Sequence, residues 1–276
     1  MFSKLLKHEF KQQGGLLAIL SGAALIAGLL GGLAMRFFAK LILEQPDSDA
    51  AVIGEILAMM LMMAMIFAII AYSIGMMILL VYRFYKRHFS DEGYLTFTLP
   101  ANTHQILLSS ITHIAIWSLI TGIVAAGAII FIVSQLMSMA ADLASMPFDL
   151  VWQEMRLAFG EQLGAGYLVL YILNVVAGGI YSLILPLLAI TIGSVVAKKH
   201  KLLAAFGIYY GVSMVLSTVT SVISVFTTIG DAFVMESTGQ FTMYLTMSVS
   251  ALLYLGIGIG GYFIMHALVD KKLNLP

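Results

Sequence analysis

The chain has 276 residues, of which 61% are hydrophobic and only 10% charged, and its formal net charge is zero. Six runs contain no Asp, Glu, Lys or Arg: 12–35, 56–81, 103–141, 162–197, 202–230 and 237–269. Each run exceeds the roughly 20 residues that an α-helix needs to cross the hydrocarbon core of a bilayer. A charge at the centre of such a helix costs about 2.5–3.5 kcal/mol on insertion scales. The pattern therefore excludes a water-soluble protein and predicts an all-α polytopic membrane protein with six transmembrane helices.

The connections between these runs are shorter than the roughly 50 residues that a folded soluble domain needs. Residues 1–276 are therefore expected to form a single transmembrane domain. The chain contains no cysteine, which excludes disulfides and thiolate zinc sites. It also contains no GxxxxGK[ST] phosphate loop, no GxSxG elbow and no HExxH pair. We expect no catalytic, cofactor-binding or metal-binding residue in this chain, and no enzymatic activity of its own.

The positions of the basic residues predict the orientation of the spans. Eleven of the 14 Lys and Arg residues lie near the termini or in the 82–102 and 198–201 links, namely Lys4, Lys7, Lys11, Arg83, Lys86, Arg87, Lys198, Lys199, Lys201, Lys271 and Lys272. The positive-inside rule places these segments and both termini in the cytoplasm, as an even number of spans requires. Most acidic residues fall on the opposite side, in or near the external links 36–55 and 142–161.

Residues 2–12 have the pattern of an interfacial helix on the inner membrane surface. An apolar arc faces away from Lys4, Lys7, His8 and Lys11, and it consists of Phe2, Leu5, Leu6 and Phe10. Glu9 interrupts this arc, and two interpretations are open. It pairs locally with a lysine at the surface, or it forms a salt bridge to a base on another element near the inner surface, such as Arg83.

Two glycine pairs have the i, i+4 spacing that lets helix backbones approach closely. Gly28 and Gly32 lie in the first span, and Gly256 and Gly260 lie in the last. Each pair is compatible with packing inside the subunit and with a contact to another subunit. In the fourth run, a break of the helix is expected near Gly178–Gly179 or Pro186.

The link between the second and third spans reads YRFYKRHFSDEGYLTFTLPANTHQ and is the largest cytoplasmic feature. Ser90 is expected to cap a short helix with Asp91 and Glu92 in its first turn, and Pro100 ends it. The segment is also expected to expose large apolar side chains, among them Phe89, Tyr94, Leu95 and Phe97. Two explanations are open: a docking surface for another protein, or a position in the lipid headgroup region.

The spans carry few groups that could bind or relay a proton. His113 and His266 are the intramembrane histidines, and both are expected to be packed rather than to act in a relay. Hydroxyls follow one face of the fifth run: Ser213, Ser217, Ser221, Ser224 and Thr228. Together with Asn174 of the fourth run, they either hold helices together or line a transport path.

The basic amphipathic start, the six spans and the YRFYKRHFSDEGYLTFTLP connector together resemble the membrane (permease) subunits of type-2 ABC exporters, most closely those of Gram-positive anaerobic bacteria. The resemblance in architecture covers the whole chain, whereas the resemblance in motif rests on the connector. It implies an interfacial elbow helix at 2–12 in a permease of the bacterial cell membrane. It also implies a coupling helix that docks on a separate ATPase through Phe89, Ser90, Asp91, Glu92, Gly93, Tyr94, Leu95 and Phe97.

The expected partners follow from this resemblance. They are an ATP-binding-cassette ATPase subunit that carries ATP and Mg²⁺, a second permease copy or paralogue, and the lipid bilayer; no nucleic acid is expected. The transported substrate is a peptide, a lipid or a drug. Two alternatives stay open, a gradient-driven secondary transporter and a non-transporting membrane sensor or immunity subunit. The first of these is disfavoured by spans that carry no carboxylate.

Overall fold

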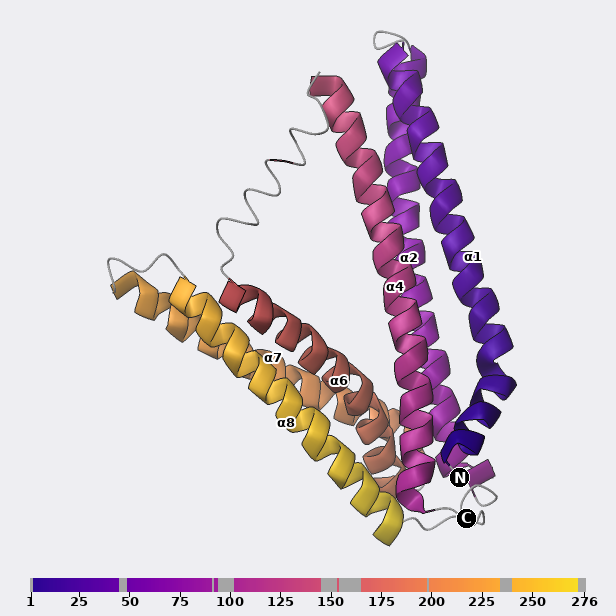
Figure 1. The fold of residues 1–276 in the computed structure, drawn as a ribbon, viewed down its shortest axis with the longest axis vertical. Helices are drawn as coiled ribbons and strands as arrows, with labels where there is room; N and C mark the ends of the chain where they lie inside the picture. Colours follow the sequence, from indigo (N-terminus) through magenta and orange to yellow (C-terminus); the bar gives the residue numbers. More distant parts are fainter. Residues whose placement is uncertain are drawn as a thin grey trace. The chain divides into compact units, whose positions relative to one another are not determined.

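The computed structural model describes residues 2–44, 49–90, 92–93, 102–144, 153, 165–197, 199–233 and 240–272. Their regular structure is helical throughout (Figure 1): α1 (Phe2–Glu44), α2 (Asp49–Phe89), α4 (Thr103–Ala144), α6 (Ala165–Val196), α7 (Lys201–Phe233) and α8 (Gln240–Lys272). Each of these helices contains a stretch that is long and apolar enough to cross a membrane. Over the described residues, the prediction of an all-α protein with six helices able to span a membrane is confirmed.

The helices follow the charge-free runs and continue past them. At 1.5 Å per residue, the 41 residues of α2 extend about 60 Å, roughly twice the thickness of a hydrocarbon core. The excess length carries the charges. Asp49 lies in the first turn of α2, and Lys86 and Arg87 lie in its last turn. Acids at a helix N-terminus and bases at a C-terminus also complement the helix dipole.

The expected interfacial helix at 2–12 is not separate from the first span, because α1 is helical without interruption from Phe2 to Glu44. Its amphipathic pattern is as predicted. Lys4, Lys7, His8 and Lys11 are exposed, whereas the apolar arc of Phe2, Leu5, Leu6 and Phe10 is half-buried. Glu9, within that arc, is buried and only 2% exposed.

The expected break in the fourth run is also absent: α6 continues through Gly178, Gly179 and Pro186. A proline inside a helix removes one backbone hydrogen bond, and tight packing on neighbouring helices compensates for this loss. Such packing surrounds Pro186, since Leu185, Leu187 and Leu188 on either side of it are all buried.

The chain divides into two compact units. One contains Met1–Leu6, Val81–Thr112 and Leu163–Pro276, and the other contains Lys7–Leu80 and His113–Gln162. The helices α1, α2 and α4 therefore each contribute residues to both units. A single transmembrane domain over 1–276 stays a prediction.

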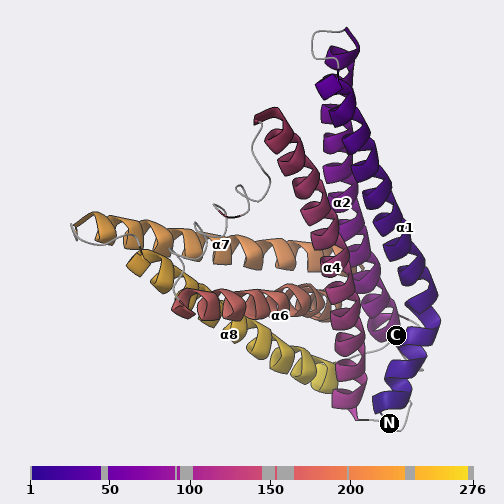
Figure 2. The same ribbon diagram turned by 45° about the horizontal axis from the view of Figure 1, so that its top comes forward.

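In the first unit, α6, α7 and α8 lie side by side, as both ribbon views show (Figure 2). Glycines permit the closest approaches. A Cβ atom on Gly193 of α6 would lie 2.7 Å from the backbone nitrogen of Ala205 in α7. On α8, a Cβ atom on Gly258 would lie 2.6 Å from Ile180 Cγ2. Small residues at these positions let the helix backbones pack closely, as is usual in membranes.

Gly193→Ala is expected to destabilise the chain by about 1–3 kcal/mol, because the new methyl group meets α7 backbone that cannot rotate away. Gly179→Ala on the same helix is the matched control, since a Cβ atom there has no neighbour within 4 Å. Thermal unfolding of both variants in one detergent measures the difference. An equal loss of stability in the two variants would contradict the close α6–α7 contact.

The second unit shows what the glycine pair of the first span does. A Cβ atom on Gly28 would lie 3.4 Å from the Ala128 Cβ of α4, and one on Gly32 would overlap the ring of Phe131. Gly28 and Gly32 thus serve packing within the chain, which decides between the two interpretations. Gly256 and Gly260 of α8 differ, because a Cβ atom on either has no neighbour within 4 Å.

Candidate functional site

The predicted coupling segment begins at the end of α2, and part of it lies within the described residues. Phe89, Ser90, Glu92 and Gly93 are described. Asp91, Tyr94, Leu95 and Phe97 lie outside the described residues, so their exposure stays a prediction. After the bend at Ser90, Glu92 and Gly93 are helical, and the Gly93 N–H donates a hydrogen bond to the Ser90 carbonyl at 2.7 Å.

The side chains of Ser90 and Glu92 contact the last turn of α2. The Ser90 hydroxyl donates a hydrogen bond to the Lys86 carbonyl, one of the C-terminal carbonyls that the helix itself leaves unsatisfied. Glu92 lies with its carboxylate 3.2 Å from Lys86 Nζ, and both side chains are partly exposed. The Ser90 hydroxyl therefore helps to end α2, and its capping of a short following helix stays a prediction.

Phe89 was expected to be exposed on the connector, and this expectation is wrong. It is the last residue of α2 and only 3% exposed. Its ring centroid lies 6.0 Å from that of Phe84 in an edge-to-face arrangement and 6.2 Å from that of His88. The burial of such a ring stabilises a fold by roughly 1.5–3 kcal/mol, so Phe89 anchors the start of the connector.

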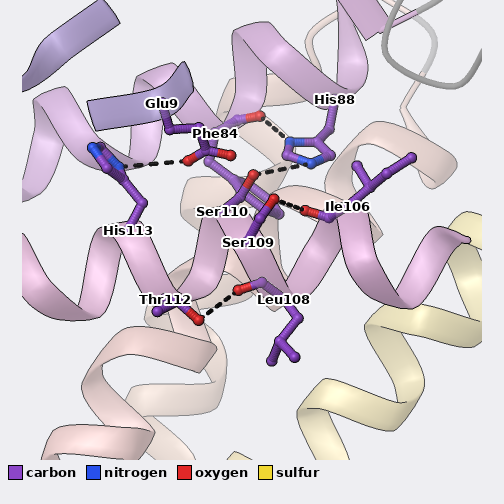
Figure 3. A network of polar contacts seen from close by, with 9 residues as sticks. All are labelled: Glu9, Phe84, His88, Ile106, Leu108, Ser109, Ser110, Thr112 and His113. Atoms are coloured by element: carbon purple, nitrogen blue, oxygen red, sulfur yellow. Dashed lines mark hydrogen bonds and ion pairs between the residues drawn. The ribbon is translucent and has the colours of Figure 1, made fainter. Parts of the chain in front are cut away.

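Next to Phe89, a buried polar core joins the C-terminal end of α2 to the start of α4 (Figure 3). His88 is fully buried, and its Nδ1 lies 3.0 Å from the Phe84 carbonyl. A carbonyl oxygen only accepts, so Nδ1 carries the proton. In the neutral ring Nε2 is then the acceptor, and the Ser110 hydroxyl of α4 lies 3.5 Å from it. The two helix ends that flank the connector are thus connected through buried groups.

The start of α4 is also connected to the end of α8. The Thr103 hydroxyl donates to Asp270 Oδ1 at 3.2 Å, and His104 Nδ1 lies 3.0 Å from the Tyr262 hydroxyl. The rings of His104 and His266 stack with their centroids 3.5 Å apart. His266 is therefore a packed residue, as expected. These contacts bring the connector side of α4 and the C-terminal end of α8 together, as the predicted topology requires.

The second unit contains a buried acid–base pair whose basic residue the sequence did not identify (Figure 3). Glu9 Oε2 of α1 lies 3.6 Å from His113 Nδ1 of α4, and both side chains are almost fully buried. Phe10 covers the pair, with its ring edge-to-face to His113 at a centroid distance of 4.8 Å. The partner of Glu9 that the structure shows is thus a base on another element, which is the second of the two interpretations. That base is His113 rather than Arg83.

Of the candidate path-lining residues, Asn174 connects helices. Its Nδ2 donates to the Met247 carbonyl of α8 at 2.7 Å, and its Oδ1 accepts a hydrogen bond from Ser250 at 2.7 Å. A side-chain amide that joins two apolar helices in this way stabilises their packing by roughly 0.6–2 kcal/mol. The packing interpretation is therefore the better one for Asn174.

The hydroxyl stripe of α7 lies largely on the outside of the chain. Ser213 and Ser224 are half-buried, whereas Ser217, Ser221 and Thr228 are exposed. Ser217 and Thr228 donate to carbonyls of their own helix, at 3.0 and 2.8 Å. In the most apolar 18-residue stretch of α7, only 6% is buried inside the chain, whereas 50% of the corresponding stretch of α6 is buried. Most of the stripe therefore has no covering helix among the described residues of this chain.

No protein-family model matches the chain, and neither a curated protein nor a solved structure matches it. The functional assignment therefore depends on the residues described above and on the connector motif.

Proposed function

We propose that this chain is the membrane subunit of a type-2 ABC exporter, which forms the translocation path as a dimer and is driven by a separate ATPase subunit. The observation that carries this proposal is the connector YRFYKRHFSDEGYLTFTLP between the second and third spans, which resembles that of such permeases. The six membrane-spanning helices support it. Since the chain has no phosphate loop, ATP and Mg²⁺ belong to the partner.

The geometry at the base of the connector suits a coupling role. Phe89 and His88 are buried at the end of α2, and Ser110 links His88 to α4. A displacement of the connector by a partner is then passed to two long helices together, rather than absorbed by a loose loop. The docking residues are Ser90, Asp91, Glu92, Gly93, Tyr94, Leu95 and Phe97, and Phe89 is their buried anchor.

The exposed hydroxyls of α7 supply the proposed path. Ser217, Ser221 and Thr228 lie on a surface that a bilayer would cover with hydrocarbon unless another protein surface or an aqueous path covered it. In a dimer, this face of α7 meets the second copy or paralogue and lines the passage between the two. The chemistry of the stripe fits a substrate that carries hydrogen-bonding groups.

Association with an ATPase tests the proposal. The tagged chain, purified from cells that co-express candidate ATP-binding-cassette ATPases of its own organism, should retain one of them in a constant ratio and hydrolyse ATP. Reconstituted vesicles should then move substrate only with ATP present. A chain that purifies without the ATPase under mild detergent conditions, and that shows no ATP-dependent activity, would exclude the exporter assignment.

The proposed orientation gives a second expected result. Both termini, residues 82–102 and Lys199 face the cytoplasm, whereas Asp49 faces outside. The chain has no native cysteine, so single cysteines report on one position each. Asp49→Cys should react with a membrane-impermeant thiol reagent on intact cells, and Lys199→Cys should react only after lysis. Both positions are exposed, so burial does not confound the comparison. The reverse pattern would invert the topology.

One observation favours a second candidate, a proton-coupled carrier. Spans without carboxylates disfavour a carrier, yet Glu9 of the apolar helix α1 lies buried against His113 of α4. Buried ionisable pairs in membrane helices commonly serve proton relays. The two candidates differ in their energy source. Transport that a protonophore abolishes while ATP persists would favour the carrier, and transport that survives the protonophore would favour the exporter.

A further inference from the structure

The helices α1, α2 and α4 surround a cavity of about 420 Å³ that lies wholly within one unit. This volume is in the roughly 300–1,000 Å³ range of small-molecule binding sites, and well above the few water-sized voids of an ordinary protein interior. Most of its lining residues are alanine or glycine, contributed by all three helices, including Ala24, Ala27, Ala64, Ala68, Ala125 and Ala128.

Two contacts between the helices delimit this cavity. On the side nearer the start of α1, the Tyr72 hydroxyl of α2 donates a hydrogen bond to the buried Ser21 hydroxyl at 2.9 Å. On the other side, Met35, Met65 and Ile132 form a buried cluster. Larger side chains thus hold the helices together at both ends. Between the two contacts, alanine and glycine leave the space unfilled.

The chemistry of the lining excludes a polar occupant. Among the residues that line the cavity none is charged, and Tyr72 supplies the one side-chain hydroxyl, which is engaged with Ser21. Cavities with apolar walls stay dry and take up apolar molecules instead. The lining residues of α1 and α2 also belong to the charge-free runs 12–35 and 56–81. The cavity therefore lies at the depth of the hydrocarbon core.

The shape and the opening fit a hydrocarbon chain. The lining extends from Ala24 to Ala34 along α1, which corresponds to about 15 Å at 1.5 Å per residue. Leu30 lines the cavity and is nevertheless 62% exposed, and Ala64 and Ala68 are exposed as well. The cavity therefore opens on a surface that a bilayer covers. We infer that it is a binding site for one acyl chain of a membrane phospholipid, which enters sideways and leaves its headgroup outside.

The inference is independent of the proposed function, because the test needs neither ATPase nor nucleotide. The chain is purified into lipid nanodiscs that contain phosphatidylcholine with a photoreactive diazirine in the middle of one acyl chain. After illumination, mass spectrometry locates the labelled residues. We expect label to concentrate within 24–34, 61–72 and 124–128. Leu203 and Phe206 of α7 are highly exposed apolar residues and report the background labelling by bulk lipid.

Two adjacent alanines of α4 give a matched pair of variants. Ala125 lines the cavity, whereas Ala126 is exposed and does not. The leucine of Ala125→Leu adds three carbon atoms inside the cavity. These atoms are expected to displace about two methylenes of a bound acyl chain, which weakens the binding of that chain about tenfold. Labelling of the cavity residues should therefore fall by about the same factor. Ala126→Leu should leave labelling unchanged. Circular dichroism and gel filtration verify that both variants are folded.

Four outcomes would overturn the inference. One is a label spread evenly over α7 and the cavity residues in the unmodified chain. Another is an equal effect of Ala125→Leu and Ala126→Leu. The third is an unlabelled cavity together with loss of self-association in Ala125→Leu, which would assign the cavity to a second copy of the chain. Phosphatidylglycerol carrying the same acyl chain should label as strongly as phosphatidylcholine, and a strong headgroup preference would contradict recognition through the chain alone.

Discussion

Replacing His113 with leucine is expected to lower the free energy of unfolding by about 3 kcal/mol. The substitution leaves the Glu9 carboxylate, only 2% exposed, without the base that lies 3.6 Å from it. Removing one member of a buried ion pair typically destabilises a protein by about 3–5 kcal/mol, because a charge stays behind in a medium of low polarity. Denaturant or thermal unfolding in one detergent measures the loss.

A double-mutant cycle separates this pairing from simple loss of volume. Glu9→Leu combined with His113→Leu removes both polar groups, so the double variant should be more stable than His113→Leu alone, since apolar replacements of buried pairs are often neutral. His8→Leu is the matched control, because His8 is exposed one residue before Glu9, and it should change stability by less than about 0.5 kcal/mol. If His113→Leu and His8→Leu changed the free energy of unfolding equally, the Glu9–His113 pair would not stabilise the fold.

The second large effect is expected at the connector. Tyr94→Ala combined with Leu95→Ala should weaken binding of the ATPase about 30-fold, since truncating the anchors of a binding hot spot commonly costs 2 kcal/mol or more. The stability of the isolated membrane subunit should stay unchanged. Binding is measured by titrating the purified ATPase against the chain in nanodiscs.

Phe89→Ala provides the contrast that makes this result interpretable. Phe89 is buried in the end of α2, so its truncation should destabilise the isolated subunit by about 3–5 kcal/mol, without any partner present. Loss of ATPase binding in the Tyr94 and Leu95 variant without loss of stability identifies docking. Retained binding and retained transport in that variant would instead place the segment on the membrane surface.

The spans could be predicted from the sequence because each depends on local composition alone. Twenty or more residues without a charge have few stable alternatives to a membrane helix, and the described part of every such run contains a helix. The amphipathic pattern of the first turns depends likewise on helical periodicity, and the exposure of Lys4, Lys7 and Lys11 agrees with it.

The contacts between distant residues could not be predicted in this way. Glu9 was recognised as misplaced in an apolar arc, but its partner lies about a hundred residues further along the chain, and any base near the inner surface would have satisfied the pattern. Phe89 illustrates the opposite error. In the sequence it belongs to a row of aromatic residues on a connector, whereas the structure buries it against Phe84 because α2 continues to Phe89.

The short connection between α6 and α7 has a consequence for how the protein is made. The two helices are joined by residues 197–200, and Gly193 lets the start of α7 pack directly on the end of α6. Because α7 carries many hydroxyl side chains, its most apolar stretch has the lowest mean hydropathy of the six membrane-spanning candidates. During synthesis, α7 therefore leaves the ribosome as the weaker half of a helical hairpin. We expect α6 and α7 to enter the lipid phase together as this hairpin.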